Sequence, residues 1–150
     1  MDNQKAIDIF NTLIVINNDR FEGYFTASLE TDNYDLKILF SEFSQTSITC
    51  KKELATEVRK MGGTPTEGTS VSGDFYNIWM DIKASITGND VHAIINSCAY
   101  GETVALDAYN EKLRNNVKEL SFDQQTILYC QYDLIKADSE KIKLMQQVSV

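Results

Sequence analysis

Four polar residues, each near the middle of a long apolar helical pattern, are the residues of this sequence best placed to do chemistry. They are Asn17, Ser47, Glu102 and Gln131. In a four-helix bundle such positions form one layer across the core, and carboxylates and histidines in that layer bind iron in di-iron proteins. This sequence has the layer but places only one carboxylate, Glu102, in it.

The other ligands of a di-iron centre are absent from the expected positions. Such a centre takes four carboxylates and two histidines, with Glu-x-x-His on two of the helices. The sequence has Ser47-x-x-Cys50 and Gln131-x-x-Leu134 at those positions. We therefore predict that the protein has no cofactor.

The single histidine cannot complete such a metal site together with Glu102. His92 precedes Glu102 by ten residues, or about 15 Å along a helix axis, so the two cannot share a site on that helix. The alternative is an iron-binding protein in which Glu22 and Glu102 contribute to an incomplete or intersubunit site. A third reading is a small-molecule-binding bundle whose polar layer lines a cavity.

Glu102 lies on the apolar face of its helix, where an unpaired charge is costly. It therefore needs hydrogen-bond donors, or a raised pKa that keeps it protonated. We expect these donors among the amides of Asn17 and Gln131 and the hydroxyls of Tyr24 and Tyr109. We predict a hydrogen-bonded polar core layer that fixes helix register and consists of Asn17, Ser47, Glu102, Gln131, Tyr24 and Tyr109.

A small rotation of the inner faces would bring other carboxylates inward. These are Glu22, Glu42, Glu53 and Glu57. The preferred interpretation for all four is a solvated helix face. For Glu53 and Glu57 it is supported by Arg59 and Lys60 beside them, which fits surface ion pairing along the helix.

Apolar residues repeated at steps of three and four predict four long helices and one short one. The glycines at positions 62 and 63 end the second helix, Gly88 ends the short one, and Ser121 with Gln124 forms a capping box for the last. The predicted ranges are Asn3–Glu30, Tyr34–Met61, Asp74–Ile86, Asp90–Asn115 and Ser121–Gln147.

The long connection between the second and third main helices decides the topology. A Gly-, Ser- and Thr-rich linker, Gly62–Gly73, precedes the short helix, in which Phe75 and Trp79 share the apolar face. Together they are long enough to cross the bundle from end to end, as the single crossover of ferritin-like folds does. We predict an all-α, ferritin-like four-helix bundle with a short crossover helix between the second and third main helices, forming one domain over residues 1–150.

Composition restricts the partners. The net charge of −8 argues against nucleic-acid binding, and no apolar run reaches membrane-spanning length. Cys50, Cys98 and Cys130 are odd in number and form no Cys-x-x-Cys pair, as expected for reduced thiols in the cytoplasm. A helical face of this kind of bundle can form a homodimer, which is the oligomer we favour.

Four segments carry a likeness to a known family: Asp19–Tyr24, Glu53–Gly63, Trp79–Gly88 and Gly101–Tyr109. In their order and spacing the chain resembles a family of small bacterial ferritin-like four-helix-bundle proteins of unknown function, over nearly its whole length. The resemblance implies the ferritin-like fold and no agreed activity. We predict a non-enzymatic cytosolic protein with a structural or interaction role, connected to stress in one version of this hypothesis, whose protein partner is unknown.

Overall fold

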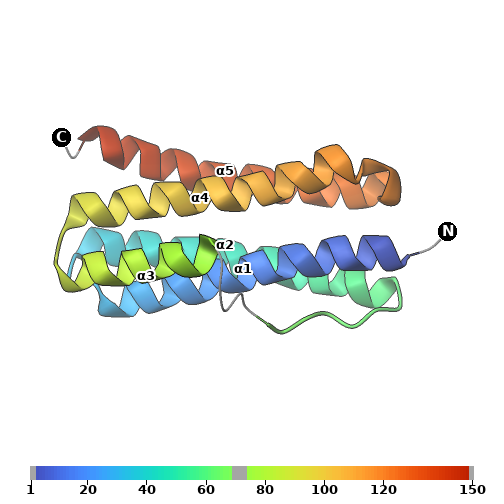
Figure 1. The fold of residues 1–150 in the computed structure, drawn as a ribbon, viewed down its shortest axis with the longest axis horizontal. Coiled ribbons are helices and arrows are strands. Elements are labelled where there is room, and N and C mark those ends of the chain that lie inside the picture. Colours follow the sequence, from blue (N-terminus) through green and yellow to red (C-terminus); the bar gives the residue numbers. More distant parts are fainter. Residues whose placement is uncertain (1–2, 69–73, 149–150) are drawn as a thin grey trace.

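The computed structural model describes residues 3–68 and 74–148, and in these ranges the chain is entirely helical (Figure 1). Each predicted helix is present, with ends that differ by one residue at most. The predicted linker is described only up to residue 68, and the Phe75 side chain lies outside the described part. The elements are α1 (Gln4–Glu30), α2 (Tyr34–Lys60), α3 (Asp74–Thr87), α4 (Val91–Asn115), a short 3-10 turn (Val117–Glu119) and α5 (Phe122–Val148).

The helix ends follow from local side-chain chemistry. The Asn33 side chain accepts a hydrogen bond from the Leu36 amide at the start of α2. The predicted capping box of α5 is confirmed: Ser121 Oγ accepts from the Gln124 amide, and Gln124 Oε1 accepts from the Ser121 amide. Gly62 ends α2 with φ +87°, a conformation that favours glycine.

The end of α3 differs in detail from the prediction. Gly88 follows the helix, but the left-handed residue is Asn89, with φ 55°. Asparagine tolerates this conformation better than most residues with a Cβ atom, so the chain turns one position later than predicted. Asp90 then caps α4 by accepting a hydrogen bond from the Ala93 amide.

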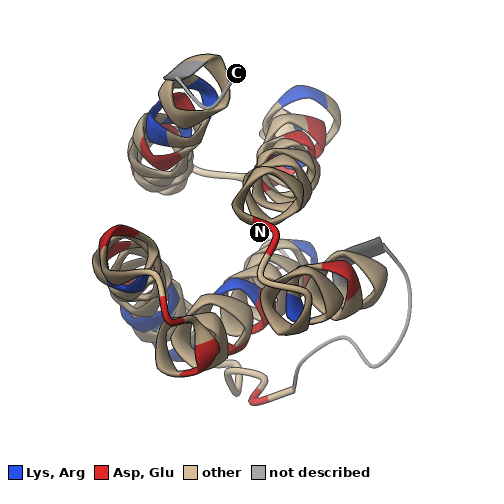
Figure 2. Cartoon of the chain, turned by 90° about the vertical axis from the view of Figure 1, so that its left-hand side faces the viewer, with Lys and Arg blue, Asp and Glu red and all other residues tan. Residues whose placement is uncertain are grey.

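The main helices form two antiparallel pairs, α1 with α2 and α4 with α5, which lie side by side (Figure 1). Seen end-on, the helix axes are nearly parallel or antiparallel to one another. The charged residues lie mainly away from the centre of the bundle (Figure 2). Because α2 and α4 run in the same direction, the connection between them must cross the length of the bundle. The helix α3 lies in that connection and packs against both α1 and α4.

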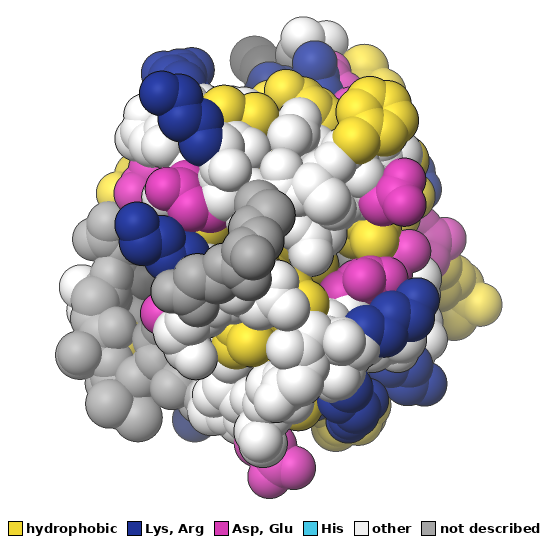
Figure 3. All heavy atoms as spheres, turned by 90° about the vertical axis from the view of Figure 1, so that its right-hand side faces the viewer, with side chains coloured by type: hydrophobic (Ala, Val, Ile, Leu, Met, Phe, Trp, Pro, Cys, Tyr) yellow, Lys and Arg dark blue, Asp and Glu magenta, His cyan; other side chains and the backbone are white. Residues whose placement is uncertain are grey.

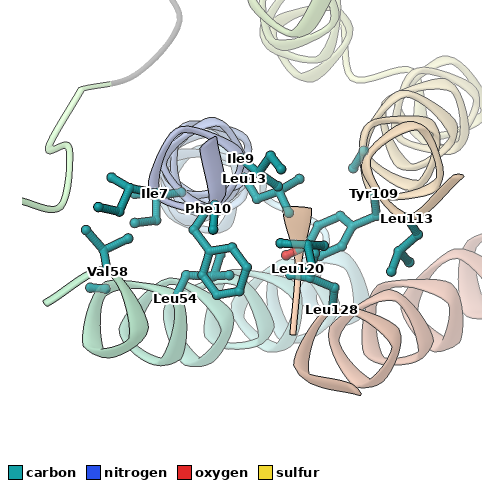
Figure 4. Packing of buried hydrophobic residues seen from close by; sticks show 14 of the residues in the cluster. Ile7, Ile9, Phe10, Leu13, Leu54, Val58, Tyr109, Leu113, Leu120 and Leu128 are labelled. Carbon is teal, nitrogen blue, oxygen red and sulfur yellow. The ribbon is translucent and has the colours of Figure 1, made fainter. Parts of the chain in front are cut away.

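The apolar core consists of two clusters, one toward each end of the bundle. The first contains Phe10, Leu13, Leu54 and Leu128, which approach one another from α1, α2 and α5 (Figure 4). The second is built around Phe40 and Phe43 of α2 and residues of α1, α3 and α4. Buried polar side chains lie between the clusters along the sequence of every main helix.

Two helical glycines let α3 approach closely. A Cβ atom at Gly23 of α1 would lie 3.3 Å from the Trp79 ring, and one at Gly101 of α4 would lie 3.0 Å from Ile78 Cγ2. Glycine inside a helix is destabilising by about 1 kcal/mol relative to alanine, so close packing of α3 offsets this cost. In the described ranges no helix is both long and apolar enough to span a bilayer.

Candidate functional site: a buried arginine cluster

The four polar residues on the apolar stripes lie in the core between the two apolar clusters. Asn17, Ser47 and Glu102 are 0% exposed, and Gln131 is 1% exposed. They come from α1, α2, α4 and α5, so each main helix contributes one of them. The side chains separate into two hydrogen-bonded groups.

Arg20 is the centre of the first group and was not predicted. Its guanidinium is buried, and Nη2 donates to Glu102 Oε1 at 2.7 Å and to Oε2 at 3.0 Å. The same nitrogen lies 3.3 Å from Oδ2 of Asp138, and Nη1 donates to Ser47 Oγ at 2.6 Å. One cation on α1 thus binds side chains of the three other main helices.

Tyr24 completes the environment of Glu102. Its hydroxyl donates a short hydrogen bond to Glu102 Oε1, and its ring lies 5.3 Å from the Arg20 guanidinium carbon. The ring itself packs against Phe40 and Phe43 at the edge of the second apolar cluster. Tyr24 is therefore held by apolar contacts in the place where it can donate to the carboxylate.

The second group is a chain of hydrogen bonds among amides and a hydroxyl, which ends at a backbone carbonyl and at the carboxylate of Glu53. Asn17 Nδ2 donates to the Tyr109 hydroxyl at 2.8 Å, and this hydroxyl donates to Gln131 Oε1 at 2.7 Å. Gln131 Nε2 donates to the Cys50 carbonyl at 3.2 Å and to Glu53 Oε1 at 2.8 Å.

Of the four donors predicted for Glu102, only Tyr24 bonds to it. Asn17, Tyr109 and Gln131 bond to one another, and Arg20 takes their expected place. A charged donor neutralises the carboxylate as well as satisfying it, which amides and hydroxyls cannot do.

Arg20, Glu102 and Asp138 form an ion cluster, and burial dominates the acid–base behaviour of these three groups. It raises the pKa of Glu102 and of Asp138 above their ordinary values, and the charge of Arg20 offsets only part of this effect. For Arg20 itself, burial would lower the pKa, but Glu102, Tyr24 and Asp138 leave it raised overall. One cation faces two carboxyl groups, so the cluster favours retention of a proton as the pH rises.

The buried thiols are poor nucleophiles. Burial raises the pKa of Cys50 to about 12 and also raises the pKa of Cys98. Burial likewise raises the pKa of the Tyr24 and Tyr109 hydroxyls. These groups are therefore protonated at neutral pH, and the thiolate that nucleophilic cysteines require is absent. Cys130 is unpaired and exposed on α5.

The remaining candidate carboxylates lie outside the ion cluster. Glu22 is exposed on α1, and Glu42 pairs with Lys141 at 3.4 Å on the surface. Glu57 pairs with Lys60 at 3.3 Å, as predicted for a solvated face. Glu53 is exposed but reaches Gln131, which the surface interpretation did not anticipate.

His92 is exposed near the start of α4. Across the residues whose positions are described, no group of three or more His, Cys, Asp or Glu side chains is arranged to hold a metal ion. The chemistry that the arrangement supports is ion pairing and hydrogen bonding inside the bundle.

Comparison with protein families places most of the chain in a family. Residues 5–115 match the family described as "Domain of unknown function (DUF2383)", which covers α1 to α4 and thus the positions of Arg20, Ser47 and Glu102. No curated protein matches the chain.

Replacing Arg20 with Met is expected to destabilise the protein by about 3–5 kcal/mol at pH 7, because Glu102 and Asp138 then remain buried without a cation. Urea unfolding followed by circular dichroism measures this cost. The triple variant Arg20→Met/Glu102→Gln/Asp138→Asn removes all three charges and is expected to regain most of the stability. A triple variant less stable than Arg20→Met would contradict the ion-cluster account.

The raised pKa values of the two carboxyl groups predict a pH dependence of stability. Between the unfolded-state pKa of about 4 and the folded-state values, the folded protein binds more protons, so stability falls as pH rises. Asp138→Asn removes one of these groups. Urea unfolding is expected to show the wild type losing stability relative to this variant from about pH 4 to pH 7.

An exposed carboxylate outside the ion cluster, Glu111 of α4, provides the control. Glu111→Gln is measured over the same pH range, which shows what the removal of a surface carboxylate does by itself. A wild type that gains stability relative to Asp138→Asn as pH rises would show that the folded-state pKa is lowered instead.

Proposed function

Since the chain belongs to this family of unknown function, we propose from its geometry that it is a non-enzymatic helical-bundle protein with a structural or interaction role in the cytoplasm. The observation that carries the proposal is the position of Arg20. Its guanidinium lies between Glu102 and Asp138, in the layer where a di-iron bundle holds its metal ligands. An internal cation thus neutralises the carboxylates of the layer.

The layer does not fit a di-iron centre. The oxygens of Glu102 and Asp138 accept hydrogen bonds from Arg20 at 2.7 Å and 3.3 Å, and a cation placed on them would face the guanidinium charge. The remaining members of the layer are amides and hydroxyls, which are weak iron ligands beside carboxylate and imidazole. Glu22, the other candidate ligand, is exposed and would need a second subunit to complete a site.

The state of the two buried thiols is compatible with a non-enzymatic role. The thiols of Cys50 and Cys98 are held protonated, and Glu102 is engaged by two donors. The crossover between α2 and α4 supports the ferritin-like fold as the scaffold, with the metal site replaced by an ion cluster. A role in stress responses stays within this proposal.

A homodimer is the assembly we propose. Four large hydrophobic side chains are exposed around the turn between α1 and α2: Phe25 at 46%, Leu29 at 65%, Tyr34 at 72% and Ile38 at 44%. A self-complementary contact of two such surfaces would remove this apolar area from water. At the opposite end of the molecule, charged side chains are interspersed with separate hydrophobic ones (Figure 3).

Iron analysis tests the proposed function. Untagged protein is measured for metal before and after anaerobic loading with Fe(II), with Glu102→Ala and Glu22→Ala as comparisons. We expect less than stoichiometric iron in all three proteins. Stoichiometric iron in the wild type that is lost in Glu102→Ala would overturn the proposal in favour of a ferritin-like metal protein, and loss in both variants would indicate an intersubunit site.

Sedimentation equilibrium tests the dimer. The double variant Leu29→Glu/Tyr34→Glu places charges at two exposed positions, so it is expected to fold normally and to sediment as a monomer. Phe122→Glu is the matched control, because Phe122 is 81% exposed at the start of α5. This control variant is expected to sediment as a dimer, as the wild type does. A monomeric wild type, or a dimer indifferent to the double variant, would rule out this surface.

A further inference from the structure

One nitrogen of the Arg20 guanidinium has no hydrogen-bond partner among the described residues. A guanidinium has five N–H groups in a planar fork. Nη1 and Nη2 donate to Ser47, Glu102 and Asp138, whereas the buried Nε has no hydrogen-bond partner among the described residues. A buried donor without a partner is costly, and native proteins usually satisfy such groups with protein atoms or water.

A small cavity lies next to this arginine, beneath α3. It is lined by Asp19, Arg20, Gly23 and Tyr24 of α1, by Trp79 of α3 and by Gly101 of α4, among others. Both glycines let α3 pack closely at the cavity wall, since a Cβ atom would lie 3.3 Å from Trp79 at Gly23 and 3.0 Å from Ile78 at Gly101. Its volume is about 20 Å³, which is enough for one water molecule and too small for a larger ligand.

The charges around the cavity select the kind of occupant. Arg20 is already opposed by Glu102 and Asp138, so no net positive charge remains to attract an anion. A cation would face the guanidinium itself. A neutral molecule that can accept one hydrogen bond and donate another matches both the Nε donor and the Asp19 carboxylate at the wall.

We propose that the cavity beneath α3 is a binding site for a single water molecule, which accepts a hydrogen bond from Nε of Arg20 and donates one to the carboxylate of Asp19. This water gives Nε of the guanidinium a partner. It also lies beside both the ion cluster and α3, because Arg20 and Trp79 line the same cavity.

Magnetisation transfer from water to the arginine Hε protons of ¹⁵N-labelled protein tests this site. The chain has arginines at positions 20, 59 and 114, and only Arg20 is buried, so the signals are separable. We expect the Overhauser effect between the Arg20 Hε and water to have opposite signs in the laboratory frame and in the rotating frame, whereas rapidly exchanging water gives the same sign in both. Such effects report a water that stays bound for longer than the protein takes to tumble.

Two variants make the result specific. Tyr24→Phe removes a hydroxyl whose exchange with solvent could relay the signal, and the water signal at Arg20 is expected to persist in it. Gly23→Ala adds a methyl group to the cavity wall, and in it the signal is expected to weaken or vanish while the Hε resonance remains. An Arg20 Hε that is observed without any water signal, or a signal abolished by Tyr24→Phe alone, would overturn the proposal.

Discussion

The structure depends on one buried cation. Arg20 pairs with Glu102 of α4 and Asp138 of α5 and donates to Ser47 of α2, so a single side chain on α1 ties all the main helices together. Removing such ions from water is expensive, and apolar replacements are often as stable or more stable. What the cluster provides is specificity, since each charged group is satisfied only when the helices are at the correct heights.

The arrangement of the apolar residues reinforces this register. The two apolar clusters lie on opposite sides of the polar layer along the bundle, and neither is interrupted by a charge. The Asn17–Tyr109–Gln131 chain runs beside the ion cluster and joins α1, α4 and α5 through neutral hydrogen bonds. Disrupting the two polar groups has different consequences. Loss of a neutral hydrogen bond leaves a dipole unpaired, whereas loss of Arg20 leaves two buried carboxyl groups without their cation.

Much of the fold follows from periodicity alone, because helices of this length carry long apolar stripes with clear ends. The layer positions Asn17, Ser47, Glu102 and Gln131 could be predicted for the same reason. Arg20 could not be recognised by residue type, since arginines are rarely fully buried. Its spacing did contain the signal: Arg20 is three residues after Asn17 and four before Tyr24, on the same helical face.

Side-chain partners were harder to predict than positions. Asp138 is seven residues after Gln131 and therefore lies on the same face of α5. An aspartate on a long helix is nevertheless expected at the surface, because this residue type is rarely buried. Apolar character alone does not separate neighbours such as Leu134 and Ile135, of which only Ile135 is buried. Phe25 of α1 is likewise apolar but 46% exposed.

The charges are divided between the two helical pairs in a way that bears on how the pairs associate. The α1–α2 pair contributes the cation Arg20, and the α4–α5 pair contributes both carboxyl groups, Glu102 and Asp138. A slip of one helical turn, about 5.4 Å, would move Arg20 away from both acids and into an apolar cluster. Such an arrangement would bury unpaired ions on each side. The ion cluster therefore acts mainly against incorrect packing of the two pairs, which gives a physical reason for charge in the core of this bundle.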